Sequence, residues 1–155
     1  MPTVDDLEAV IISVFPLVPV TQAVLEEPTA LWDVYDDAAE TANLVGRNWS
    51  DIQEEFLYKH EALLLFAGDS LFCMLLPAYL RYLLHERSRF NSLPHQVASQ
   101  LTRKGDPERD VRFERRVALL TPSQRAAVGD VLALLATVPP MEEPMTAALE
   151  TWTAQ

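Results

Sequence analysis

Residues 70–84 constrain the fold more than any other part of this chain, because they are apolar around nearly the whole circumference of a helix. A helix without a polar face must be covered by other elements, so we expect this segment at the centre of a domain. Asp69 is expected to cap its start. Pro77 lacks a backbone N–H and crowds the carbonyl of Cys73, which predicts a kink or, alternatively, a complete break into two short helices.

The rest of the chain also has helical spacing, without the sustained alternation that marks β-hairpins. Thr3 is a capping residue, and Thr121-Pro122-Ser123-Gln124 combines a capping box with proline at the first helical position. The prediction is a compact all-α fold, one domain over residues 1–155, with about six helices around a proline-kinked central helix. The further helices are expected over residues 4–15, 29–45, 51–66 (capped by Ser50 with Gln53), 93–102, 108–119 and from 122 to Pro139-Pro140, while residues 139–155 form a weak helix or fray.

Acidic and basic residues are sorted along the chain. Residues 1–70 carry 14 Asp and Glu against Arg47 and Lys59, and residues 81–125 carry 10 Lys and Arg against 5 acids. Such sorting predicts one negative and one positive territory on the folded surface. The net charge of −11 disfavours binding to nucleic acid or anionic membranes and favours a basic protein as partner.

The acidic residues of the first half are the first candidate site. Carboxylates three and four residues apart share a helix face, where two of them can hold a divalent cation. No Glu precedes a His by three residues, as a di-metal bundle site requires, so a solvated, partner-binding face is favoured over a metal site and no cofactor is expected. The partner-binding candidates are Asp33, Asp36, Asp37, Glu40, Asp51, Glu54 and Glu55.

The histidines give weaker support for an enzyme. His60-Glu61 and His85-Glu86 are adjacent pairs whose side chains diverge by about 100° on a helix, so surface histidines are favoured over an acid–base dyad. Pairing of His60 with an acid of the second helix stays open. No phosphate-binding glycine loop, nucleophile elbow or metalloprotease motif occurs in the sequence.

The second candidate is a set of four arginines expected to lie exposed on the helix over 108–119. Arginines so placed can dock phosphate or carboxylate groups, or pair with acidic residues of the same chain. Phe113 is the one aromatic residue beside them, which disfavours base stacking and favours intramolecular or protein-facing use. These anion-binding candidates are Arg109, Arg112, Arg115 and Arg116.

The third candidate is the surroundings of Pro77. A proline kink can open a small pocket near which Tyr79 and Tyr82 place their hydroxyls; the alternative is that Pro77 shapes packing and the tyrosines reach solvent.

The compartment follows from a few residues. Cys73 is the one cysteine, which excludes an internal disulfide, and its apolar neighbours predict a buried, inert thiol. Asp5 and Asp6 stand where a signal peptide carries positive charge, so a cytoplasmic location is expected. The apolar stretch 62–84 is interrupted by Pro77 and charged residues, so no membrane span is predicted.

Trp49, Leu76-Pro77-Ala78-Tyr79-Leu80 and Leu120-Thr121-Pro122-Ser123-Gln124 occur in this order over residues 29–136. The combination resembles a family of small bacterial proteins of unknown function. The resemblance implies an α-helical cytoplasmic protein and assigns no reaction, cofactor or catalytic residue.

Two functions are therefore carried forward. The first is a non-enzymatic protein-binding module, specifically an immunity or antitoxin protein that neutralises a basic toxin through its acidic surface. The alternative is a small metal-carboxylate hydrolase that uses the acidic helix and His60. The oligomeric state stays open.

Overall fold

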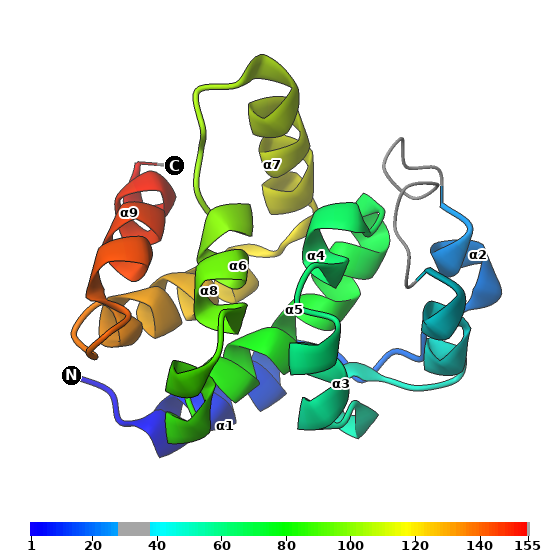
Figure 1. The fold of residues 1–155 in the computed structure, drawn as a ribbon, viewed down its shortest axis with the longest axis horizontal. Coiled ribbons are helices and arrows are strands. Elements are labelled where there is room, and N and C mark those ends of the chain that lie inside the picture. The colour runs from blue at the N-terminus through cyan, green and yellow to red at the C-terminus, as the bar shows by residue number, and fades with distance from the viewer. Residues whose placement is uncertain (28–37, 155) are drawn as a thin grey trace.

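The computed structural model describes residues 1–27 and 38–154, and within these ranges the chain forms helices without a β-strand (Figure 1). The predicted all-α fold is confirmed. In chain order the elements are α1 (Val4–Val14), α2 (Gln22–Leu25), the 3-10 helices η2 (Ala38–Leu44) and η3 (Trp49–Asp51), α3 (Glu54–Lys59), α4 (Leu63–Phe66), α5 (Asp69–Leu83), the 3-10 helix η4 (Glu86–Phe90), α6 (Leu93–Gln100), α7 (Pro107–Leu119), α8 (Pro122–Leu135) and α9 (Glu142–Thr153).

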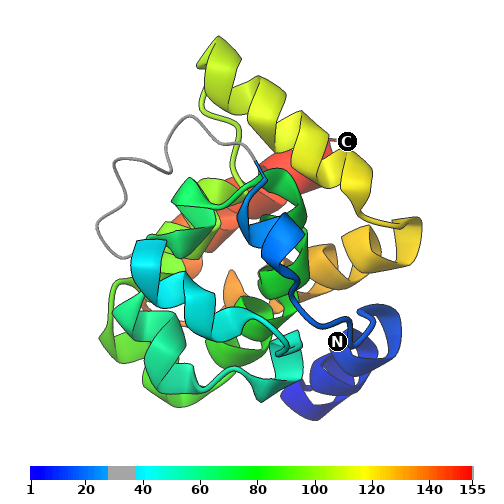
Figure 2. The same cartoon turned by 90° about the vertical axis from the view of Figure 1, so that its right-hand side faces the viewer.

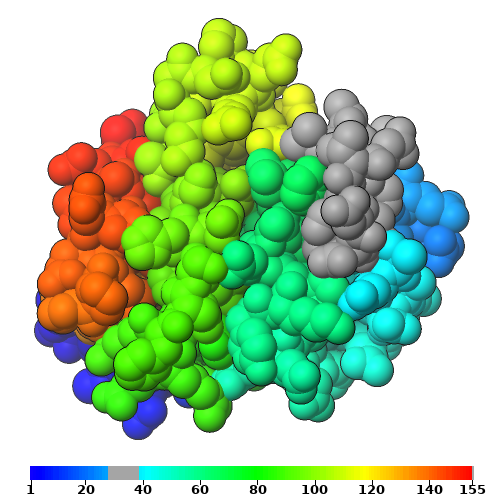
Figure 3. Space-filling model, viewed as in Figure 1, coloured from blue at the N-terminus to red at the C-terminus, as the bar shows by residue number. Residues whose placement is uncertain are grey.

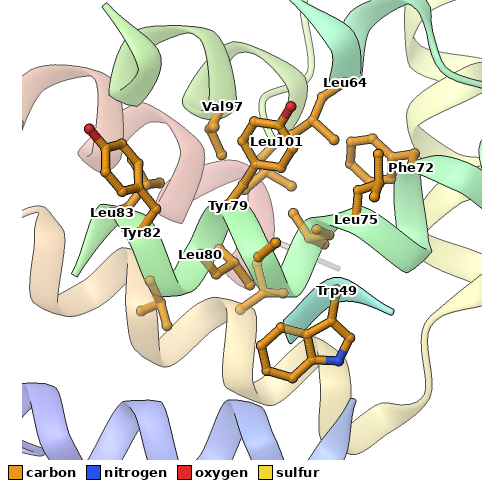
Figure 4. Close-up of a cluster of buried hydrophobic side chains, with 14 of the residues drawn as sticks. Trp49, Leu64, Phe72, Leu75, Tyr79, Leu80, Tyr82, Leu83, Val97 and Leu101 are labelled. Atoms are coloured by element: carbon orange, nitrogen blue, oxygen red, sulfur yellow. The ribbon is translucent and has the colours of Figure 1, made fainter. Parts of the chain in front are cut away.

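Helix α5 lies at the centre, as its apolar circumference predicts. Ten of its fifteen residues are buried, and it contacts α1, α3, α7 and α8 among other elements. Figure 4 shows Trp49 on one side of α5 and Val97 and Leu101 of the α6 region on the other. The helix passes through Pro77 without interruption, so the predicted alternative of two separate helices is wrong. Packing on all sides holds the segment helical despite the missing hydrogen bond to Cys73.

The start of α5 differs from the prediction that Asp69 caps it. Gly68 is the N-cap residue, and Asp69 is the first residue of the helix. The amide of Ser70 donates to Glu27 Oε1 at 3.0 Å, so a carboxylate that follows α2 satisfies this free N–H. Asp69 is thereby left to bind side chains of α7.

Two predicted helix starts are confirmed by their side chains. The Thr3 hydroxyl accepts from the amide of Asp6 at the start of α1, and the Thr121 hydroxyl accepts from the amide of Gln124 at 3.2 Å at the start of α8. In both cases the third helical residue bonds back to the cap amide, which completes a capping box. Figure 2 shows α1 beside α8.

Residues Glu142–Thr153, within the predicted segment 139–155, form helix α9. Met145, Ala148 and Trp152 are buried against α6 and α8, and Trp152 Nε1 donates to the carbonyl of Arg125 at 2.8 Å. The Trp152 ring lies against Gly129, where a β-carbon would stand only 3.3 Å from it. A small residue in α8 therefore allows α9 to approach closely.

The region between residues 38 and 66 is where the helix predictions are wrong. Residues 38–44 form a 3-10 helix, and the rest of the predicted helix 29–45 falls largely outside the described residues. The predicted helix 51–66 is divided into η3, α3 and α4. Asn48 and Asp51 form the capping box expected of Ser50 and Gln53, and the chain then runs extended through Ile52, whose side chain is buried. Burial of Ile52 in the core therefore takes precedence over a continuous helix.

Candidate functional site

The arginines of α7 do not form an exposed row. Asp106 caps the helix by accepting from the amides of Glu108 and Arg109, and α7 then runs with Phe113, Arg116 and Val117 buried. Arg116 is 2% exposed, so the prediction that all four arginines are exposed is wrong. It lies three residues after Phe113 on the apolar face of α7, which packs on α5.

Arg116 joins α7 to the corner between α4 and α5. Its Nη1 donates to the carbonyl of Leu64 at 3.0 Å, its Nη2 to that of Ala67 at 2.7 Å, and its Nε to Asp69 Oδ1 at 3.2 Å. The guanidinium carbon lies 4.2 Å from the centroid of the Phe72 ring. These donors satisfy carbonyls at the end of α4 that have no helical partner. Burial lowers the pKa of Arg116 to about 10, so the side chain stays charged at neutral pH.

Two further arginines of α7 also contact the same corner. Arg115 Nε lies 2.9 Å from Asp69 Oδ2, and Arg112 Nη1 donates to the carbonyl of Leu65 at 3.3 Å. Asp69 thus bridges two adjacent arginines. Much of the arginine set therefore binds the protein's own chain.

A basic cavity remains between α6 and α7. Its volume is about 100 Å³, and its lining includes Gln96, Ser99, Lys104, Arg109, Arg112 and Arg116. No carboxylate is among the lining residues. The cavity brings three of the four predicted anion-binding arginines together with Lys104 and with polar side chains of α6. The sequence did not indicate that Lys104 and the α6 residues lie beside these arginines.

The acidic candidates are distributed over several elements. Asp33, Asp36 and Asp37 lie outside the described residues. Glu40 on η2 places Oε2 2.9 Å from His60 Nε2 and 3.6 Å from Lys59 Nζ. His60 is 2% exposed, so the prediction of surface histidines is wrong for this residue.

The remaining three acidic candidates lie close together in the chain. Asp51 is the last residue of η3, and Glu54 and Glu55 are the first two residues of α3. Asp51 Oδ2 accepts from the amide of Asn48 at 3.2 Å and is exposed. Glu55 is also exposed and takes part in no ion pair within the described ranges. Glu54 is half-buried and contacts His85 and Arg87, so the three carboxylates are not equivalent.

His85 lies between two carboxylates from distant parts of the chain. Its Nδ1 is 2.7 Å from Glu54 Oε1 on α3, and its Nε2 is 3.0 Å from Glu8 Oε1 on α1. A ring protonated on both nitrogens donates to both carboxylates. Glu54 Oε2 also lies 2.6 Å from Arg87 Nε. Burial raises the pKa of Glu54, but the hydrogen bonds from Arg87 and His85 lower it by more, so the net shift is downward.

An apolar cavity of about 190 Å³ lies beside Pro77. Phe15, Trp49, Met74, Leu119 and Leu120 are among its lining residues. The tyrosines expected near it lie elsewhere.

The two tyrosine hydroxyls bond within the protein. The Tyr79 hydroxyl donates to the carbonyl of His60 at 3.1 Å, and the Tyr82 hydroxyl accepts from Asn91 Nδ2 at 2.9 Å. Both side chains are buried, so neither predicted position, at a pocket or in solvent, is correct.

The thiol of Cys73, predicted to be buried, is only partly buried. Burial raises the pKa of Cys73 to about 12, so the thiol is protonated at neutral pH. Within residues 1–27 and 38–154, no three His, Cys, Asp or Glu side chains are grouped as metal ligands.

Four of the residues that carried the family resemblance lie together at the apolar cavity. Trp49, Pro77, Leu120 and Gln124 all line it, although they come from four different elements or connections. A family model covers residues 3–155. The chain belongs to DUF6714, a family of unknown function. No curated protein and no solved structure matches the chain.

Membership of DUF6714 assigns no ligand or reaction. No described helix has the length and apolar character needed to cross a membrane. Figure 3 shows residues 38–66 on the right-hand side of the molecule and α7 at its top. The elements that carry Asp51 and Glu55 are thus separated from the basic cavity beside α7.

Proposed function

We propose that this protein is a non-enzymatic binding module that engages a basic partner protein through exposed carboxylates on η3 and α3. The observation that carries the proposal is the negative charge left after intramolecular pairing. Five of the twenty carboxylates in residues 1–27 and 38–154 take part in ion pairs, which leaves fifteen without a cationic partner. A negative field of this kind speeds the approach of a positively charged partner.

Among the four described members of the acidic set, Asp51 and Glu55 are the best placed for contact. Both are exposed, whereas Glu40 and Glu54 hold histidines and basic side chains of the same chain. In its finer form, the proposal is an immunity or antitoxin protein of a bacterial cytoplasm that captures a basic toxin. A reducing compartment agrees with the protonated, partly buried thiol of Cys73.

Charge reversal tests the proposal. The chain carrying Asp51→Lys and Glu55→Lys is used to capture partners from an extract of the native host, beside the unmodified chain. The matched control is Glu142→Lys with Glu143→Lys, which reverses two exposed charges in the first turn of α9. We expect the first variant to lose a basic partner that both the control and the unmodified chain retain. Equal loss of the partner in both variants would mean that binding depends on net charge and not on the position of Asp51 and Glu55. Retention of the partner by both variants would contradict the assigned surface.

One contact favours the hydrolase as a second candidate. The hydrolase hypothesis pairs His60 with an acidic residue of the predicted second helix. Glu40 is such a residue, and its Oε2 lies 2.9 Å from His60 Nε2. Binding of Mn²⁺ or Zn²⁺ to the native protein must raise its melting temperature by mass action, and Glu40→Gln must reduce the rise. An unchanged melting temperature at millimolar metal would exclude this candidate.

A further inference from the structure

The cavity between α6 and α7 gathers hydrogen-bond donors and positive charge without a carboxylate in its lining. Arg109 and Arg112 are three residues apart, and Arg112 and Arg116 four apart, so all three follow one side of α7. Arg116 is bound to Asp69 and to two backbone carbonyls, so its charge is largely compensated. The free charge of the cavity therefore comes from Lys104, Arg109 and Arg112.

These three cations have few partners of their own. The side chains of Lys104 and Arg109 take part in no ion pair in the described part of the chain, and Arg112 has one backbone acceptor, at 3.3 Å. The nearby Asp110 accepts from the backbone amide of Lys104 at 2.8 Å. Burial lowers the pKa of Arg112, the charges of Arg109 and Arg115 lower it further, and Asp69 opposes them. A bound anion would relieve this crowding of like charges.

Polar side chains of α6 add neutral donors. Gln96 and Ser99 line the cavity, and Gln100 Oε1 already accepts from Arg116 Nη1 at 3.5 Å, which leaves its amide nitrogen as a donor. A cavity surrounded by guanidinium, ammonium, amide and hydroxyl donors suits a ligand that accepts hydrogen bonds in several directions.

Size decides which anion fits. Pockets for whole drug-sized ligands occupy roughly 300–1,000 Å³. The cavity of about 100 Å³ is well below this range and takes one compact group, not a nucleotide. We propose that the cavity between α6 and α7 binds a phosphate group, either as free phosphate or as the terminal group of a small phosphomonoester. Because Lys104 and Arg109 are exposed, the remainder of a monoester extends into solvent.

The proposal is tested by calorimetric titration at constant ionic strength with inorganic phosphate, glycerol 3-phosphate and acetate. The variant Lys104→Gln with Arg109→Gln removes two exposed cations whose side chains contact no described carboxylate. The matched control Arg47→Gln with Lys59→Gln removes one arginine and one lysine, both exposed, that do not line the cavity. Each of the two double variants changes the net charge by the same amount.

We expect inorganic phosphate or glycerol 3-phosphate to bind the unmodified chain and the control with similar millimolar or tighter affinity, and the cavity variant at least fivefold more weakly. The more tightly bound of the two identifies free phosphate or a phosphomonoester as the ligand. Equal affinity in the cavity variant and the control would overturn the site. No binding of either ligand at 10 mM would overturn the proposal, and acetate binding as tight as that of phosphate would overturn the assigned chemistry.

Discussion

Replacing Arg116 with methionine removes the buried cation that joins α7 to the corner between α4 and α5. The carbonyls of Leu64 and Ala67 lose donors at 3.0 and 2.7 Å, and a buried acceptor without a partner costs about 1–3 kcal/mol. Asp69 keeps Arg115 as its partner and is 22% exposed, so its own penalty is small. We expect the free energy of unfolding to fall by about 3–5 kcal/mol, as for other buried pairs that lose one partner.

The assay is urea unfolding followed by tryptophan fluorescence and circular dichroism, with Arg115→Met as the control. Arg115 shares Asp69 with Arg116, but its side chain is 59% exposed. Loss of an exposed ion pair costs about 1 kcal/mol or less. Arg116→Lys keeps the charge but replaces the wide planar guanidinium, whose three nitrogens reach Asp69, Leu64 and Ala67, with one compact ammonium group. Its loss of stability should therefore fall between those of the two methionine variants. Equal losses for the two methionine variants would refute the argument that burial makes Arg116 structural.

Three further predictions concern separate groups. Thr121→Ala should lower the free energy of unfolding by about 1 kcal/mol through loss of the α8 cap, whereas Ser123→Ala, at an exposed residue of the same turn, should change it little in thermal unfolding. Because the pKa of Glu54 is lowered on folding, its stabilisation is complete above its ordinary pKa of 4.5 and is lost as the pH falls through the lower folded value. As the pH is lowered from 6 to 3, the unfolding midpoint should therefore fall less in Glu54→Gln than in the unmodified chain. An equal fall in both proteins would contradict the assigned contacts of Glu54. Native Cys73 is partly buried and has its pKa raised to about 12, so it should resist iodoacetamide at pH 8 and react after denaturation, as mass spectrometry would show. Rapid labelling of the native protein would contradict the raised pKa.

Local sequence signals predicted the elements whose ends are fixed by neighbouring residues. The capping boxes at Thr3 and Thr121 each lie within four residues, so the starts of α1 and α8 could be placed from the sequence. The central position of α5 followed from its composition. These features depend on short spacings that a sequence shows directly.

The site geometry depended on contacts between residues far apart in the chain. Arg116 meets Asp69 across 47 residues and Leu64 across 52, and His85 meets Glu8 across 77. Helical spacing places Arg116 beside Phe113, which was a usable signal for its burial. Nothing in the local sequence around His85 indicates its two carboxylate partners.

The cavity between α6 and α7 illustrates the same limit. The arginines of α7 were identified as anion-binding candidates, but Gln96, Ser99 and Lys104 join them only through the packing of α6 and the following turn. Conversely, the continuous helix expected over 51–66 was lost because Ile52 and Leu57 both enter the core. Tertiary burial therefore decided both outcomes.

The central claim, capture of a basic partner by the negative field of η3 and α3, is tested most directly by the salt dependence of association. The rate constant of the partner recovered from the native host is measured by stopped flow between about 20 and 500 mM salt, where screening of exposed charges becomes nearly complete. Electrostatic steering predicts an association rate that falls steeply over this range, with a shallower slope for Asp51→Lys with Glu55→Lys than for Glu142→Lys with Glu143→Lys. A rate that is independent of salt in the unmodified chain would contradict the claim.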